Sequence, residues 1–273
     1  MELLTMSTQQ GATLERKIPH QDDTLSQKAG YRQWPIAVNH PASLEACVDI
    51  RDHGIAGKNL YNRTDAPPYF EQFDGSIPEL FVRVGVLEKL KEANKILAFH
   101  NAEVFVNDSW RPAQVQQGGR AWCERDIRTH FPGWTDTQVL DEVSNFWAVG
   151  PKTQDDIDPL SPPPHSTGGA LDLTLRRVSD GQDLWMGTIA DDTTEKAYVD
   201  WFERYADPAS FSDREAQRNR RLLYHTMTDL GFVVNPTEWW HVSWGDQLWA
   251  CITSARTGQH VEAWYSVASP RRA

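Results

Sequence analysis

Hydrophobic residues recur at helical spacing between residues 76 and 100. The apolar positions in this segment are Leu80, Val84, Leu87, Leu90 and Leu97. Spacings of three, four and seven residues place these side chains on one face of an amphipathic helix. Ser76 is a candidate N-cap, and Glu79 would complete a capping box three residues later. The pattern therefore predicts a helix over residues 76–100.

Two other segments alternate with the period of a β-strand. Residues 103–112 begin with such an alternation and end at a proline, so Arg111 is expected at the end of a strand. Residues 170–175 place three leucines on one face and Asp172 on the other. The leucine face is predicted to belong to the core.

Further helices and strands follow without the regular alternation of a parallel βαβ fold. Thr135 and Gln138 form a capping-box pattern at the start of a helix over 135–149, and another helix is predicted over 213–230. The segment 150–165 is rich in Pro and Asp and is predicted to be a loop. This mixture of elements predicts an α+β fold.

Length and composition are those of one globular domain. The chain has 273 residues, of which 40% are hydrophobic and 24% are charged, as in ordinary folded proteins. Residues 1–30 are polar and have no sustained period. We expect them to form an N-terminal arm without chemistry of its own, and residues 31–273 to form a single domain.

The charge and the apolar runs exclude several partners. Lys and Arg number 27 and Asp and Glu 38, a net charge of -11, so the broad positive field that attracts nucleic acid or anionic lipid is missing. No apolar run has the length of a signal-peptide core or a transmembrane helix. We expect no nucleic-acid or membrane partner and a cytoplasmic location.

His165 and Asp172 form the first candidate site. Seven extended residues span roughly 23 Å, too far for two ligands of one ion. Gly168 and Gly169 lie between them and can adopt the backbone angles that would fold the chain back. In the alternative interpretation, the glycines make a tight turn, His165 is on the surface and Asp172 accepts an N–H.

Glu238 and His241 form the second candidate site, within an aromatic, strand-like segment. On a regular strand a three-residue step points two side chains to opposite faces. The backbone should therefore bend near Glu238, just after Pro236, if both side chains face one cleft. A metal ion would provide a partner for such ionisable groups among tryptophans.

Two histidines and one carboxylate with an open fourth position make a catalytic zinc site, in which the pKa of bound water falls to about 7. A zinc hydrolase also needs a carboxylate that is not a ligand to move protons, and Glu238 fits that role. Arg111 is a candidate to stabilise the developing oxyanion. In the alternative interpretation, Arg111 is a structural residue that pairs with Asp108 or another surface acid.

Five motifs in this order carry a family resemblance. They are Asp108–Pro112, His165–Thr174, Met186–Thr188, Asn219–Leu223 and Glu238–His241. The set resembles the D-alanyl-D-alanine dipeptidases of the VanX type, zinc peptidases that share a fold with D,D-carboxypeptidases and the hedgehog signalling domain. The resemblance implies a small antiparallel sheet flanked by helices, with residues 31–273 as the zinc peptidase catalytic domain.

The resemblance also implies roles for individual residues. The zinc ligands would be His165, Asp172 and His241, with Glu238 as general base and Arg111 at the oxyanion. An acid after the Met-Gly-Thr segment would hold the substrate ammonium, and Asp191 occupies that position, although Ala190 replaces the usual aromatic residue before it.

The position of the family's substrate-binding serine is Pro163 here, which has neither a hydroxyl nor an N–H. Ser161 or Ser166 could take its place. The predicted function is a zinc-dependent dipeptidase acting on a small dipeptide, D-Ala-D-Ala. The alternatives are a zinc carboxypeptidase or dipeptidase of other specificity, and a catalytically silent zinc-binding recognition domain.

Overall fold

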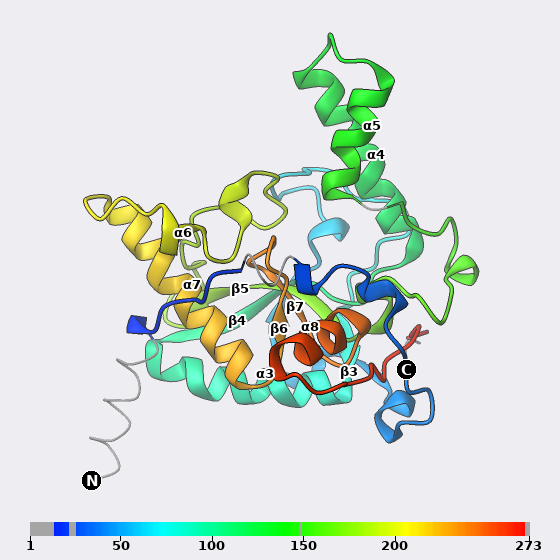
Figure 1. Cartoon of the computed structure of the whole chain (residues 1–273). Coiled ribbons are helices and arrows are strands. Elements are labelled where there is room, and N and C mark those ends of the chain that lie inside the picture. Colours follow the sequence, from blue (N-terminus) through cyan, green and yellow to red (C-terminus); the bar gives the residue numbers. More distant parts are fainter. Residues whose placement is uncertain (1–13, 22–25, 148, 271–273) are drawn as a thin grey trace.

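A computed structural model of the chain describes residues 14–21, 26–147 and 149–270 (Figure 1). Its α-helices include α3 (Val84–Leu97), α4 (Ala113–His130), α5 (Asp136–Phe146), α6 (Trp201–Arg204), α7 (Phe211–Asp229) and α8 (Gln247–Thr257). Its strands include β1 (Cys47–Asp49), β2 (Ala56–Gly57), β3 (Phe81–Arg83), β4 (Ala102–Asp108), β5 (Ala170–Arg177), β6 (Val233–Val234) and β7 (His241–Ser243). A 3₁₀ turn, Pro164–Thr167, precedes β5.

The strands form two sheets. Five strands lie in the order β2-β4-β5-β7-β6, and β1 pairs with β3 in a separate sheet. Neighbouring strands are antiparallel except β2 and β4, which run parallel. A parallel pair needs a crossover connection, and here that connection contains β3 and α3. The predicted α+β fold is confirmed, but the sheet expected to be antiparallel is mixed at its β2 edge.

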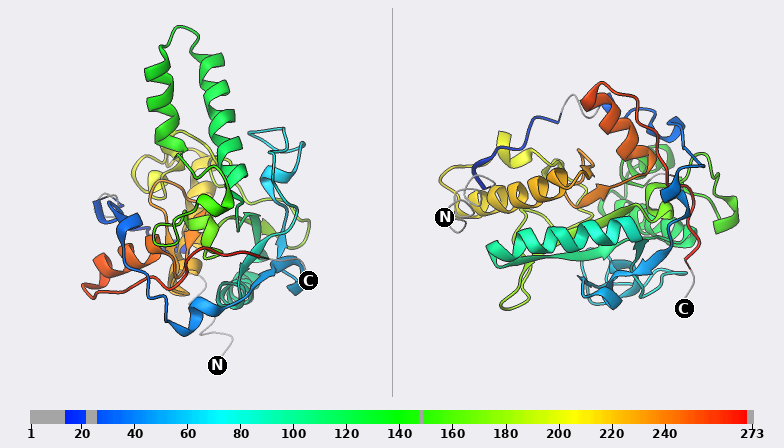
Figure 2. Two further views of the ribbon diagram at one scale, coloured as in Figure 1. Left: turned by 90° about the vertical axis from the view of Figure 1, so that its right-hand side faces the viewer. Right: turned by 90° about the horizontal axis from the view of Figure 1, so that it is seen from below.

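One face of the larger sheet packs on helices. Leu171, Leu173 and Leu175 of β5 are fully buried in a core that they share with α3 and α7. These two helices lie side by side (Figure 2), and α7 confirms the helix predicted over 213–230. Since side chains alternate along a strand, Asp172 projects from the opposite face of the sheet.

The helix predicted over 76–100 begins later than expected, at Val84. Ser76 lies in the loop before β3, and the Leu80 N–H donates to the Asp49 carboxylate. Pairing of β3 with β1, more than thirty residues earlier in the chain, overrides the local helical pattern. The buried members of the predicted stripe are Leu80, Leu87, Leu90 and Leu97, whereas Val84 is 37% exposed.

α4 and α5 form a hairpin that projects from the rest of the molecule (Figures 1 and 2). α5 begins with the predicted capping box between Thr135 and Gln138 and ends at Phe146, short of the predicted end. The sequence pattern does not predict α4. A Cβ on Gly119 of α4 would lie 2.2 Å from the Trp147 ring, so glycine is needed there for the ring to pack against the helix.

The described part of the N-terminal segment contacts the body of the molecule. Ile18 is 4% exposed and belongs to the main core, and Lys28 lines the main cavity. The division into an arm over 1–30 and a domain over 31–273 stays a prediction. Among the described residues, no helix is both long enough and apolar enough to span a membrane.

Candidate active site

The first two predicted ligands lie in the turn before β5 and on β5 itself. His165 lies in the 3₁₀ turn, and Asp172 lies on β5. Gly168 ends the turn with φ +72°, a left-handed conformation that glycine adopts without strain. A Cβ on Gly169 would lie 2.5 Å from the carbonyl oxygen of Trp244, so a side chain would block the close approach of the chain to its neighbour. The two glycines bring the imidazole and the carboxylate together, as predicted.

The third predicted ligand, His241, is the first residue of β7 and pairs directly with Asp172. The bend expected near Glu238 is present. The Glu238 N–H donates to the carbonyl of Asn235, and the His241 N–H donates to the carbonyl of Glu238. Because of this bend, Glu238 and His241 both line the same cavity.

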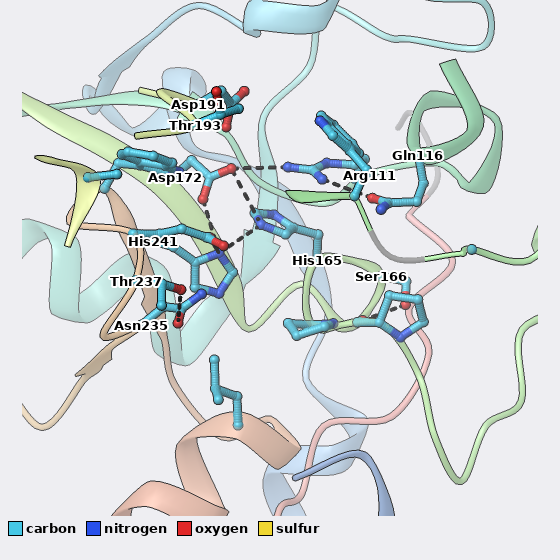
Figure 3. A pocket seen from close by; sticks show the side chains of 18 of the residues that line it. Arg111, Gln116, His165, Ser166, Asp172, Asp191, Thr193, Asn235, Thr237 and His241 are labelled. Atoms are coloured by element: carbon cyan, nitrogen blue, oxygen red, sulfur yellow. Dashed lines mark hydrogen bonds and ion pairs between the residues drawn. The ribbon is translucent and has the colours of Figure 1, made fainter. Parts of the chain in front are cut away.

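The three ligand side chains converge (Figure 3). His165 Nε2 lies 3.1 Å from His241 Nδ1 and 3.4 Å from one carboxylate oxygen of Asp172. His241 Nδ1 lies 3.1 Å from the other carboxylate oxygen. All three residues are buried, with ligand atoms within 4.8 Å of one another. This is the donor set of a catalytic zinc site, so the residues fit a metal ion.

The outer nitrogens of both imidazoles also have partners. His165 Nδ1 lies 2.8 Å from the carbonyl oxygen of Ser109 and 3.1 Å from Asp108 Oδ2. His241 Nε2 lies 3.3 Å from the Ser243 hydroxyl. Such contacts fix the orientation of a ligand ring and the nitrogen that it presents to the metal. The inner nitrogens of the two rings are therefore the ones available to an ion.

The site concentrates negative charge around these nitrogens. Burial disfavours a charged imidazole, but the carboxylates of Asp172 and Asp108 outweigh burial and raise the pKa of His165 to about 10. Burial would also raise the pKa of Asp172, yet His165 and His241 hold that pKa well below its usual range. Carboxylates that favour a positive charge this strongly also favour a bound cation.

Arg111 lies just beyond β4, beside the ligands. Its Nη2 donates to Asp172 Oδ2 and to the Tyr61 hydroxyl, each at 3.0 Å. Its Nε donates to Asp108 Oδ2 at 2.8 Å. The guanidinium carbon lies 4.7 Å from the centre of the Tyr61 ring and 5.4 Å from that of Trp147. Arg111 thus pairs with Asp108 and lines the cavity at the same time.

Glu238 lies on the cavity wall next to the ligands. Its Oε2 is 3.7 Å from His241 Nδ1, the nitrogen that faces the other ligand atoms, and its side chain is 35% exposed. Glu238 is not one of the clustered ligands. Its carboxylate is therefore close to the candidate metal position and open to molecules that enter the cavity.

The cavity has a volume of about 720 Å³ and an acidic end at Asp191 (Figure 3). The carboxylate of Asp191 accepts hydrogen bonds from the hydroxyls of Tyr61 and Tyr69, at 3.0 and 2.8 Å. Burial and the charge of Asp172 raise the pKa of Asp191 to about 6. Two buried phenols therefore hold Asp191 in place, and the charge of Asp172 affects its pKa.

Ser166, the other predicted substrate-binding residue, also lines the cavity. Its hydroxyl donates to the carbonyl of Pro163 at 2.7 Å, so its proton is already used within the turn. Pro163 is a neighbouring part of the wall and offers no donor. A role for Ser166 in substrate binding stays a prediction.

Three residues of the site escape prediction from the sequence: two line the cavity, and the third donates to Asp191. Tyr61, Tyr69 and Lys28 come from segments far along the chain from the ligand motifs. Tyrosine and lysine are common both at surfaces and in packed interiors, and no motif marks these three. Only the folded chain brings them to the site.

Comparison with known proteins assigns the chain to a family. The model of the Peptidase M15 family, described as D-Ala-D-Ala dipeptidase, matches residues 79–261. The chain belongs to this family. It is 35% identical over 241 residues to a D-alanyl-D-alanine dipeptidase of Synechocystis sp., an alignment that covers 82% of this chain and 89% of that protein. The resemblance inferred from the five motifs is confirmed.

Two other relatives are also D-alanyl-D-alanine dipeptidases. The protein from Enterococcus faecium is 36% identical over 159 residues, or 56% of this chain and 68% of that protein. The protein from Escherichia coli is 39% identical over 96 residues, or 35% of this chain and 45% of that protein. Among solved structures, VanYB in complex with D-alanine-D-alanine is 14% identical with a TM-score of 0.34, and the match covers 74% of this chain and 91% of that one.

Proposed function

We propose that this M15 peptidase is a zinc-dependent dipeptidase that hydrolyses D-Ala-D-Ala. The observation that carries the proposal is the place of Glu238, whose carboxylate lies 3.7 Å from a ligand nitrogen but outside the ligand set. Hydrolysis by an activated water needs a base beside the metal centre that is not itself a ligand. The dipeptide is the one named in the relatives from three organisms.

The residues that would hold zinc are His165, Asp172 and His241. When bound at such a site, zinc lowers the pKa of water to about 7 and polarises a carbonyl group. Asp108, Ser109 and Ser243 keep the two imidazoles in the orientation that this requires. Because these contacts already orient the two imidazoles, the rings need little rearrangement to bind a metal ion.

Glu238 carries the proton transfers in this mechanism. It accepts a proton from the attacking water and later donates it to the nitrogen of the departing D-alanine, which leaves as a neutral amine. Its side chain is partly exposed on the cavity. The carboxylate can therefore reach both the water and the leaving group.

Arg111 stabilises the negative charge that develops on the carbonyl oxygen as water adds to it. Asp108 and the Tyr61 and Trp147 rings hold its guanidinium in place. A donor fixed in advance is more effective than one that must reorganise during the reaction.

Asp191 binds the substrate ammonium, positioned by the hydroxyls of Tyr61 and Tyr69. An ammonium ion beside this carboxylate would form a charge-assisted hydrogen bond within the cavity. The proposal therefore requires a free amino group on the substrate.

The test is the release of free alanine from D-Ala-D-Ala and from N-acetyl-D-Ala-D-Ala by zinc-loaded protein. We expect turnover of the first and at least a hundredfold slower turnover of the second. Equal turnover of both would favour a carboxypeptidase or a dipeptidase of other specificity. Stoichiometric zinc without turnover of any short peptide would favour a catalytically silent domain.

A further inference from the structure

The end of the cavity opposite Asp191 is formed by a turn and by the N-terminal segment. Figure 3 shows Asp191 at one end and Asn235 and Thr237 at the other, with the ligand cluster between them. Lys28 lines this second end and donates from Nζ to Asn235 Oδ1 at 3.0 Å and to Thr237 Oγ1 at 3.2 Å. A residue from the segment that we expected to have no chemistry thus reaches the active-site cavity.

The hydrogen bonds of Lys28 leave part of its ammonium group available. A lysine ammonium has three N–H donors and no acceptor, and the two bonds to Asn235 and Thr237 use two of them. Both partners are neutral oxygens. In the part of the chain that the structure describes, no carboxylate lies within ion-pair distance of Lys28 Nζ. Within the described residues, the third N–H and the positive charge therefore have no partner, and they can meet an anion.

The surroundings of Lys28 favour such an anion. Burial lowers the pKa of Lys28, and the negative charge of Glu238 only partly opposes this effect. A partly buried cation without a counter-ion gains stability when an anion enters beside it. Among the other wall residues, Ser166 uses its proton on the Pro163 carbonyl, and Arg32 is a second cation that donates two of its five N–H groups to Ser161.

The charges of the cavity therefore match a zwitterion. A dipeptide carries an ammonium at one end and a carboxylate at the other, on opposite sides of its single peptide bond. With the ammonium at Asp191 and the peptide bond at the ligand cluster, the carboxylate points toward the end that holds Lys28. We propose that Lys28 binds the C-terminal carboxylate of the dipeptide substrate and so selects peptides that end at that residue. This inference rests on the proposed dipeptidase function.

Calorimetry of ligand binding tests the inference without relying on turnover. The zinc-loaded Glu238→Gln protein would be titrated with D-Ala-D-Ala and with D-Ala-D-Ala amide, which lacks the carboxylate. We expect the free acid to bind at least tenfold more tightly than the amide. Adding Lys28→Met should weaken binding of the acid at least tenfold and leave binding of the amide unchanged, which would also show that the pocket is intact.

Two further variants serve as controls. Lys28→Arg keeps the charge and should retain part of the preference for the acid. Lys17→Met removes an exposed lysine of the same N-terminal segment and should bind both ligands as the Glu238→Gln protein does. The inference is overturned if Lys28→Met weakens the binding of acid and amide by the same factor. It is also overturned if Lys28→Met weakens the binding of neither ligand.

Hydrolysis by the parent protein separates this inference from the proposed function. If the parent hydrolyses D-Ala-D-Ala while Lys28→Met leaves the preference for the acid unchanged, only the assignment of Lys28 fails. If the parent does not hydrolyse D-Ala-D-Ala and its Glu238→Gln variant binds neither ligand, the dipeptide is the wrong substrate and both proposals fail.

Discussion

Two arginines lie inside this molecule in contrasting surroundings. Arg111 lines the cavity beside the ligands, and its guanidinium donates to the carboxylates of Asp108 and Asp172. Arg220 lies on α7, packs away from that cavity and is 2% exposed. Its donors reach three backbone carbonyls, those of Met186, Lys196 and Tyr198. One arginine faces charged groups and a cavity, and the other faces neutral groups in the packed interior.

These surroundings shift the two pKa values in opposite directions. Burial acts to lower the pKa of Arg111, but Tyr61, Asp108 and Asp172 outweigh it and raise that pKa well above its usual range. At Arg220 burial dominates and lowers the pKa to about 9. The positive charge of Arg111 is thus stabilised beside the cavity, as its proposed role requires, whereas the contacts of Arg220 hold a loop.

The loop that Arg220 holds is the one that carries Asp191. The three carbonyls that accept from Arg220 lie on both sides of Asp191 along the chain. The guanidinium therefore fastens the loop to α7 and keeps the acidic end of the cavity in place. The contrast between the two arginines separates a group that we propose to act in the reaction from one that supports the site.

The largest expected effect is that of Arg111→Met on catalysis. Removal of a preorganised oxyanion donor costs about 10²–10³ in kcat. The melting temperature should stay within a few degrees of the parent value, because the carboxylates left behind keep other partners: Asp108 keeps His165, and Asp172 keeps His165 and His241. Steady-state kinetics and a thermal melt of the same zinc-loaded sample check this. A variant with parental kcat would show that Arg111 is only structural.

Arg220→Met should mainly lower the stability of the protein rather than kcat. It removes the hydrogen bonds to three carbonyls, of which that of Met186 lies in the buried interior and that of Tyr198 keeps the Trp201 N–H as a donor. A buried carbonyl left without a donor costs about 1–3 kcal/mol, so we expect a loss of about 2 kcal/mol in the free energy of unfolding. Denaturant titration measures this loss, and Arg218→Met, an exposed change on the same helix, is the matched control. Unchanged stability in Arg220→Met would contradict the supporting role that distinguishes Arg220 from Arg111.

A smaller effect concerns the pH dependence of KM at the acidic end. With its pKa raised to about 6, Asp191 is ionised at pH 7 and loses its charge as the pH falls through about 6. The ionised fraction falls about tenfold between pH 7 and pH 5, so KM for D-Ala-D-Ala should rise by about that factor. Asp191→Asn should have a raised KM at pH 7 and lack this dependence. A parent profile identical to that of Asp191→Asn would contradict the role of Asp191.

The clustering of the three candidate ligands could be predicted from the sequence because its signals are local. Gly168 and Gly169 mark the fold-back between His165 and Asp172, and the position of Pro236 marks the bend that turns Glu238 and His241 to one cavity. The same local patterns predict β5, α5 and α7 close to their observed bounds.

The remaining features depend on contacts between distant segments. Residues 81–83 have a helical pattern but pair with β1 instead, and α4 is stabilised by packing against α5 and Trp147. Tyr69 reaches Asp191, and Lys28 reaches the cavity, only through the tertiary fold. Sequence periodicity contains no information on such pairings, so the cavity wall could not be predicted from it.

The most direct test of the account compares the parent with Glu238→Gln, measuring zinc content and alanine release from D-Ala-D-Ala on the same samples. We predict about one zinc per chain in both proteins, turnover by the parent, and turnover about 10²–10⁴ slower in the variant, as expected for loss of a general base. Turnover by Glu238→Gln at the parental rate, or a zinc-loaded parent that releases no alanine, would contradict the account.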